Sequence, residues 1–161
     1  MKKIKRGQAW GFDLIIASTL FLGGIITFYL YSLNISEEAD TNLNKLTYDG
    51  NIITNILLSE GVPSNWTESN LIYPGLLSKN KINQTKLDMF YSLSVNNYDT
   101  TKAIFNTEYE YYLFFSQNIT VNGVQIEGIG KAPVNPRNLI KIERITLYKD
   151  QPAKMNLDIW Q

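Results

Sequence analysis

The sequence predicts an α+β fold in which a long N-terminal helix, first transmembrane and then amphipathic, leads into a head with a small antiparallel sheet. Three observations support this prediction. An uncharged run extends from Leu14 to Ser36, apolar residues at helical spacing come after it, and short alternating or aromatic segments between turn residues dominate the end of the chain. The expected divisions are a basic leader at 1–7, a transmembrane helix at 8–33, an extracytoplasmic continuation of that helix at 34–60, and an α+β head at 61–161.

Residues 8–33 are expected to cross a membrane once. At about 1.5 Å per residue, the uncharged run spans roughly 35 Å, and a bilayer core needs about 30 Å. Trp10, Tyr29 and Tyr31 lie near its ends, where aromatic rings favour the interface. A secretory signal peptide fits less well, because the run is long and no small-x-small cleavage site comes after it. Basic residues before the run and acidic residues after it place the N-terminus in the cytoplasm and the head outside: Lys2, Lys3, Lys5 and Arg6, then Glu37, Glu38 and Asp40.

The helix is expected to continue beyond the membrane until Gly61 and Pro63 end it. Gly50, beside Asp49, is one of the stripe residues. It indicates either a bend in the helix or close packing of another backbone, and a weak point in the helix is the favoured interpretation. The stripe recurs at spacings of three or four residues: Ile35, Ala39, Leu43, Leu46, Gly50, Ile53 and Leu57.

The composition excludes several classes of function. The chain has no cysteine and no histidine, so thiolate chemistry, disulfides and the commonest general base and metal ligand are missing. We therefore expect no enzyme activity, no cofactor and no metal. Four of the 15 basic residues lie in residues 1–7, which leaves 11 basic and 15 acidic residues and a net charge of −4. Nucleic acid is not an expected partner, because its binding needs a basic surface.

Four or five antiparallel strands are expected in the head. Glu108–Ser116 is dense in aromatics and is expected to be central. Ile119–Val121 and Val124–Ile126 flank Asn122-Gly123, a strong hairpin signal. The strand Leu139–Tyr148 should contain a bulge between Ile142 and Ile145, where its apolar phase slips. After a turn at Asp150-Gln151-Pro152, alternation from Ala153 to Ile159 predicts a strand with one buried face.

Shorter elements are expected before the sheet. Leu71–Tyr73 is expected to be extended. Asn83 or Thr85 should cap a helix that ends near Leu93, with Leu87, Phe90 and Tyr91 facing inward. Asp99 should cap a shorter helical turn that ends at Phe105.

Few residues of the head suggest chemistry. Glu108 and Glu110 would share one side of a strand, and paired carboxylates can act as acid and base, but a solvated face is favoured. The aromatics Tyr109, Tyr111, Tyr112, Phe114 and Phe115 would form either a glycan- or partner-binding face or, as favoured, core. Glycosylation sequons occur at Asn65, Asn83 and Asn118; a fourth, Asn34, is too near the membrane.

The segment Lys5-Arg6-Gly7-Gln8, with an apolar helix directly after it, resembles the class III signal peptide of archaeal type IV pilins and related surface filament proteins. The segment Leu57–Trp66 is similar to the stretch after the helix in many small proteins of this type. The resemblance implies a pilin-like fold and cleavage between Gly7 and Gln8 by a membrane-embedded prepilin-type peptidase. It also implies that the helix stays on the mature protein.

Asp13 departs from the family pattern. Many pilins have a glutamate at the fifth mature position, here Phe12, and Asp13 is at the sixth. In the family that acid meets a freed N-terminal amine during assembly; alternatively, Asp13 lies at headgroup level and complements the helix N-terminus.

The expected function is a structural subunit or minor pilin of a type IV pilus-like cell-surface filament. Its expected partners are membrane lipid, the peptidase and further copies or other pilin subunits. The alternative is a single-pass, membrane-anchored binding or sensory domain that uses the leader only for insertion.

Overall fold

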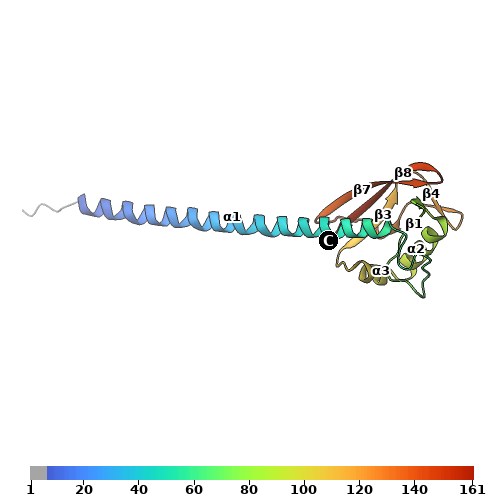
Figure 1. Cartoon of the computed structure of the whole chain (residues 1–161). Coiled ribbons are helices and arrows are strands. Elements are labelled where there is room, and N and C mark those ends of the chain that lie inside the picture. Colours follow the sequence, from blue (N-terminus) through green and yellow to red (C-terminus); the bar gives the residue numbers. More distant parts are fainter. Residues whose placement is uncertain (1–6) are drawn as a thin grey trace, which may run out of the picture. The chain divides into compact units, whose positions relative to one another are not determined.

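The computed structural model describes residues 7–161, and it describes side chains for 11–33 and 41–161 (Figure 1). The chain divides into two compact units after Asn42, and we call residues 43–161 the head. Helix α1 (Gly7–Leu57) belongs to both units. The predicted long helix is therefore confirmed, and it ends before the predicted boundary at residue 60.

The predicted α+β fold is also confirmed. The main sheet has the strand order β6-β3-β8-β7, and two small hairpins, β1–β2 and β4–β5, lie outside it. Every strand pair is antiparallel. After α1 the elements are β1 (Leu77–Ser78), β2 (Lys81–Ile82), α2 (Gln84–Asn96), α3 (Tyr98–Phe105), β3 (Glu110–Phe115), β4 (Ile119–Val121), β5 (Val124–Ile126), β6 (Ile129–Gly130), β7 (Leu139–Tyr148) and β8 (Gln151–Trp160).

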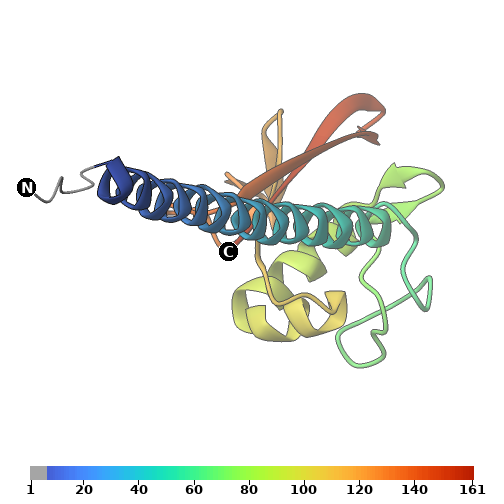
Figure 2. The ribbon, with the colours of Figure 1, turned by 90° about the vertical axis from the view of Figure 1, so that its left-hand side faces the viewer.

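In the described part of the chain, α2, α3 and the end of α1 pack on one face of the main sheet. The end of α1 packs on β7 and β8, and the ring of Phe105 in α3 meets the ring of Tyr111 in β3 edge-on, with centroids 5.4 Å apart. Phe90 of α2 packs on Phe105, with centroids 6.1 Å apart. In Figures 1 and 2, β7 and β8 lie above the end of α1, and α2 and α3 lie below it.

At Gly50 the helix α1 packs closely against side chains of the main sheet, and the helix is not interrupted there. α1 continues through it, and a Cβ atom there would lie 2.5 Å from Ile142 Cδ1 and 3.1 Å from Ile159 Cγ2. The favoured interpretation of a weak point is therefore wrong; the tight packing is real, although side chains make it, not backbone. Three other stripe residues are fully buried, namely Leu46, Ile53 and Leu57. Leu43 is 36% exposed, and the side chains of Ile35 and Ala39 lie outside the described ones.

The strand Leu139–Tyr148 contains no bulge. Its pairing with β8 runs without interruption from Leu139↔Trp160 to Tyr148↔Gln151. The apolar phase slips because Ile142 faces the helices while Ile145 is 73% exposed on the opposite face.

The predicted turn at 150–152 is shifted. Lys149 and Asp150 have φ of 50° and 64° and form the two-residue connection, and Gln151 and Pro152 already belong to β8. Pro152 is tolerated there because β3 pairs only with residues 155–160 of β8, so this end of the strand has a partner on one side.

β8 is buried on both faces, which corrects the prediction of a single buried face. Asn156 and Asp158, which alternate with the core residues, are only 5% and 7% exposed. The cause is the position of β8 between β3 and β7, whose large side chains cover it from both sides.

Both predicted helices are present, and they differ from the prediction in detail. The Asn83 side chain accepts a hydrogen bond from the backbone N–H of Lys86 at 3.1 Å and caps α2, as expected. Leu87 and Phe90 are buried, whereas Tyr91 is only partly buried. Asp99 does not cap α3, because the helix begins at Tyr98 and Asp99 therefore lies within its first turn.

The backbone of the segment after α1 is closely packed around Trp66. The Trp66 indole N–H donates to the carbonyl oxygen of Gly75 at 2.8 Å, and Trp66 is 1% exposed. A side chain at Gly75 would overlap backbone atoms of Ser59 and Gly61. An isolated bridge between Val62 and Tyr73 accounts for part of the extended piece predicted at 71–73.

Candidate functional site: the N-terminal helix and the surfaces of the head

The first candidate site is the apolar part of α1. The segment Gly11–Leu33 has 23 residues, none of them buried, and the mean hydropathy of its most apolar 18-residue window is 1.9. The segment is long and apolar enough to cross a bilayer, a property that membrane anchors and signal sequences share.

Three hydroxyl groups within this segment bond to the backbone of the helix itself. The hydroxyls of Ser18, Thr19 and Thr27 donate to the carbonyl oxygens four residues earlier, at 2.7, 2.8 and 2.8 Å. Such bonds remove the cost of a bare hydroxyl in hydrocarbon. Asp13 is then the one charged residue between Gly11 and Leu33, and its side chain is exposed.

Two of the four predicted cleavage residues, Gly7 and Gln8, lie at the start of α1. Lys5 and Arg6 are outside the described residues. Gly7 is the first helical residue and Gln8 is the second, but their side chains, like that of Trp10, are outside the described ones. Tyr29 and Tyr31 are 62% and 67% exposed.

Glu108 and Glu110 interact with different lysines. Glu108 precedes β3 and lies 3.9 Å from the amine of Lys45. Glu110, the first residue of β3, lies 3.0 Å from the amine of Lys102 in α3 and 3.6 Å from that of Lys131. Burial alone would raise the pKa of Glu110, but Lys102, Tyr98 and Lys131 hold that pKa below its ordinary value. The two carboxylates therefore act in ion pairs and not as one acid–base pair.

Asp158 is a carboxylate on the outer face of the main sheet, opposite the helices, and it is 7% exposed. It pairs across the sheet with Tyr112 and Lys141, and its Oδ1 is buried without a hydrogen bond, 3.7 Å from the Lys141 amine. Burial raises the pKa of Asp158, and Lys141 offsets this only in part. The Lys141 amine also lies 5.1 Å from the centre of the Phe114 ring.

The aromatic residues of β3 and Tyr109, which directly precedes it, divide between the two faces. Tyr109, Tyr111 and Phe115 are buried in the core, as favoured. Tyr112 and Phe114 are partly buried on the outer face, with ring centroids 5.8 Å apart.

Lys86 forms a buried cross-link that sequence reasoning missed. Its amine donates to the carbonyl oxygens of Glu60 at 2.6 Å and Leu77 at 2.8 Å. Burial lowers the pKa of Lys86, against the opposing charge of Glu60. This residue ties the chain after α1 to β1 and to α2. A lone lysine within a helix pattern gives no signal of such a role.

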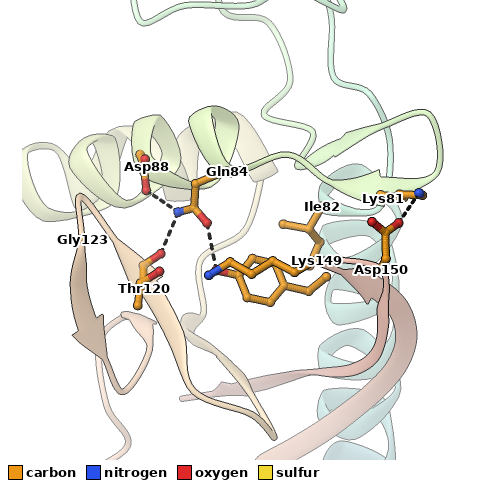
Figure 3. Close-up of a pocket in the computed structure, with 9 residues that line it drawn as sticks. Lys81, Ile82, Gln84, Asp88, Thr120, Gly123, Lys149 and Asp150 are labelled. Atoms are coloured by element: carbon orange, nitrogen blue, oxygen red, sulfur yellow. Dashed lines mark hydrogen bonds and ion pairs between the residues drawn. The ribbon is translucent and has the colours of Figure 1, made fainter.

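A polar pocket of about 400 Å³ lies where α2 meets the β4–β5 and β7–β8 hairpins (Figure 3). Gln84 lies at its centre: its amide donates to Asp88 and to the Thr120 carbonyl, both at 2.7 Å, and accepts from the Tyr148 hydroxyl at 2.8 Å. An ion pair of Lys81 and Asp150 closes one side.

The pKa of Tyr148, which lines this pocket, is shifted. Burial alone would raise the pKa of its hydroxyl, but Thr120 and Lys149 hold it below the ordinary value of 10.0. The polar groups around Gln84 bind one another and join α2 to the β4–β5 and β7–β8 hairpins.

Two of the predicted sequons are accessible. Asn65 and Asn118 are exposed, whereas the Asn83 side chain is engaged as the cap of α2. Among the residues that the structure describes, no group of three acidic side chains is placed to hold a metal ion. No family model matches the chain, and no curated protein or solved structure matches it either.

Proposed function

We propose that this protein is a structural subunit or minor pilin of a type IV pilus-like filament at the archaeal cell surface, anchored and assembled through α1. The observation that supports the proposal most is the dual role of this helix. Its residues Gly11–Leu33 are apolar and exposed, while its last turns, with Leu46, Ile53 and Leu57 fully buried, belong to the core of the head.

An exposed apolar helix of this length needs a cover. Leaving it in water would cost on the order of 25 cal/mol per Å² of apolar surface. Lipid supplies the cover in the membrane, and the helices of neighbouring copies would supply it in a filament. The internally bonded hydroxyls of Ser18, Thr19 and Thr27 suit both environments.

The leader gives the orientation and the processing step. Its four cations keep the N-terminus in the cytoplasm, where a prepilin-type peptidase would cut between Gly7 and Gln8 and leave α1 on the mature protein. The head then lies outside the cell. The Asp13 carboxylate, costly within a membrane unless paired, would meet the N-terminal amine of a neighbouring copy.

A membrane-anchored binding or sensory domain is the second candidate. The observation that favours it is the pocket around Gln84, which is large enough for a small polar ligand. It stands second because the polar groups at the centre of that pocket already bind one another.

Mass spectrometry of the native protein tests processing first. A mature N-terminus at Gln8 is expected, and retention of Met1 would reject pilin-type cleavage. Negative-stain microscopy of sheared surface material then tests assembly, and an absence of filaments containing this protein would favour the second candidate.

Asp13 provides a sharper test of assembly. Asp13→Ala should abolish filaments and leave membrane insertion intact, whereas Asp13→Glu, which keeps the charge, should restore part of the yield. Ser18→Ala, in the same exposed segment, is the matched control. Equal filament yield from Asp13→Ala and from the unaltered chain would reject the assembly role of the carboxylate.

A further inference from the structure

We propose that a groove between α1 and α3 binds the loop 132–136 of a neighbouring copy of this chain. The inference rests on the proposed function, because it requires copies held side by side. We call the surface the α1–α3 groove and define it by Tyr48, Asp49, Ile52, Ile56, Ile104 and Glu108.

The groove consists of two adjoining pockets of about 400 and 610 Å³ that share Tyr48, Asp49 and Asn106. Tyr48, Ile52 and Ile56 recur every four residues and form a second apolar stripe on α1, distinct from the stripe that packs on the sheet. Tyr48 is 67% exposed. An apolar floor open to solvent, with polar groups at its edge, is typical of a docking surface.

The rim of the groove has an acidic excess. Asp49 accepts a hydrogen bond from the Thr107 hydroxyl at 2.8 Å, which leaves its charge in place. The side chain of Glu108 is 88% exposed, and its one ion-pair partner among the described residues, Lys45, lies 3.9 Å away. Glu108 therefore takes part in an exposed ion pair with Lys45 and remains accessible to a second cation from outside.

The loop 132–136 has the complementary properties. Val134 is 80% exposed, the highest value among the large apolar side chains that the structure describes. Pro133 and Pro136 fix φ on both sides of it, so little conformational freedom would be lost on docking. Arg137 comes next and is exposed, and its backbone N–H donates to the Gln161 carbonyl at 3.1 Å.

Groove and loop lie at the same end of the head. Glu108 contacts Lys45 near the start of the head portion of α1. Arg137 is bonded to Gln161, the neighbour of Trp160, and Trp160 pairs with Glu110 at the start of β3. Copies aligned side by side would therefore bring the loop of one to the level of the groove of the next.

Such a contact joins two different surfaces, so it is heterologous. A heterologous contact that does not close into a ring continues as an open helical array. It places Val134 on the floor formed by Tyr48, Ile52 and Ile56, and Arg137 beside Glu108.

Disulfide cross-linking tests the contact directly, because the chain has no cysteine of its own. Full-length protein with both Tyr48→Cys and Val134→Cys is oxidised in native membranes and in sheared material, then separated without reductant. A ladder of dimers, trimers and higher species is expected. Each single variant should give no ladder, and a mixture of the two single variants should give dimers only.

The matched control pairs Tyr48→Cys with Val95→Cys, since Val95 is 64% exposed elsewhere in the head. A ladder from this pair as strong as that from the Tyr48–Val134 pair would overturn the inference. So would a cross-link from Tyr48→Cys to a protein of another mass, which would identify a different occupant.

A charge exchange provides the second arm. Arg137→Glu should lower the cross-linking yield about three- to five-fold, as expected for the loss of one exposed ion pair, and adding Glu108→Arg should restore it. If the cross-linking yield is not restored, Arg137 and Glu108 do not pair in the contact.

The outcomes separate this inference from the proposed function. Filaments without a ladder overturn the inference alone. A ladder without filaments supports the contact and rejects the filament, and the absence of both rejects the two proposals together.

Discussion

At the scale of single residues, two carboxylates of the main sheet should respond to pH in opposite ways. The folded-state pKa of Asp158 is raised above its ordinary 3.8, mainly by burial. Below about pH 3 both states are protonated and no penalty exists. As the pH rises above 3.8, the unfolded chain loses the proton first, so stability falls until the folded pKa is passed. Asp158→Asn should therefore increase the free energy of unfolding near pH 7 and have little effect near pH 3.

Glu110 is the matched control for that experiment. Its folded-state pKa is lowered from 4.5, so its ionised form contributes stability that is fully present above 4.5 and lost as the pH falls through the folded value. Glu110→Gln should destabilise the head near pH 7 and do so less in acid. Urea titrations of the full chain in detergent, monitored by tryptophan fluorescence, measure both variants. A loss of stability for Asp158→Asn near pH 7 would show that the Lys141 ion pair outweighs burial.

Two glycines should differ sharply in their tolerance of alanine. At Gly75 a Cβ would meet backbone atoms of Ser59 and Gly61, which cannot move without disrupting the packing around Trp66. At Gly50 the nearest atom is the end of the Ile142 side chain, which can rotate, and alanine raises helix propensity by about 1 kcal/mol. We expect Gly75→Ala to lower the free energy of unfolding by about 3 kcal/mol or more, and Gly50→Ala to change it by less than about 1 kcal/mol. Equal effects in urea unfolding would contradict this account.

At the scale of elements, local patterns predicted what local chemistry determines. Asn122-Gly123 fixed the β4–β5 hairpin, Asn83 fixed the start of α2, and the apolar stripe fixed the buried face of α1. The sequence did not reveal β1, β2 or β6, because each has only two residues. It also missed the second buried face of β8, since that depends on which strands lie beside it.

For the candidate site as well, the sequence predicted only the features that are local in the chain. The apolar helix and Asp13 are local and visible in the sequence. The α1–α3 groove and the Gln84 pocket join residues far apart in the chain, such as Tyr48 with Glu108 and Gln84 with Tyr148. Only the fold brings those residues together.

The end of α1 should be essential to the fold of the head. Leu46, Ile53 and Leu57 are fully buried, and burial of each contributes about 1.5–3 kcal/mol, against a total stability of about 5–15 kcal/mol for a typical domain. We expect residues 43–161 to fold as a soluble unit and residues 61–161 to remain unfolded. Circular dichroism and the dispersion of amide signals in NMR spectra measure this. A cooperative unfolding transition in the shorter fragment would show that the sheet needs only α2 and α3.

At the scale of the whole molecule, one helix connects two units with different requirements. Residues Gly11–Leu33 are apolar and without burial, and the head has its own core. Membrane attachment and folding of the head should therefore be separable by mutation, even though α1 takes part in both.

The double variant Leu22→Lys with Ile25→Lys tests that separation. A lysine at the centre of a membrane helix costs about 2.5–3.5 kcal/mol in insertion, so two should move the chain into the fraction released by alkaline carbonate. Because both side chains are exposed, at 57% and 49%, the free energy of unfolding of the head should stay within about 0.5 kcal/mol of the unaltered chain. Leu22→Val with Ile25→Val is the matched control and should stay in the membrane. A head destabilised by the lysines would mean that the two units depend on each other, and retention of the lysine variant in the membrane would mean that another part of the chain anchors it.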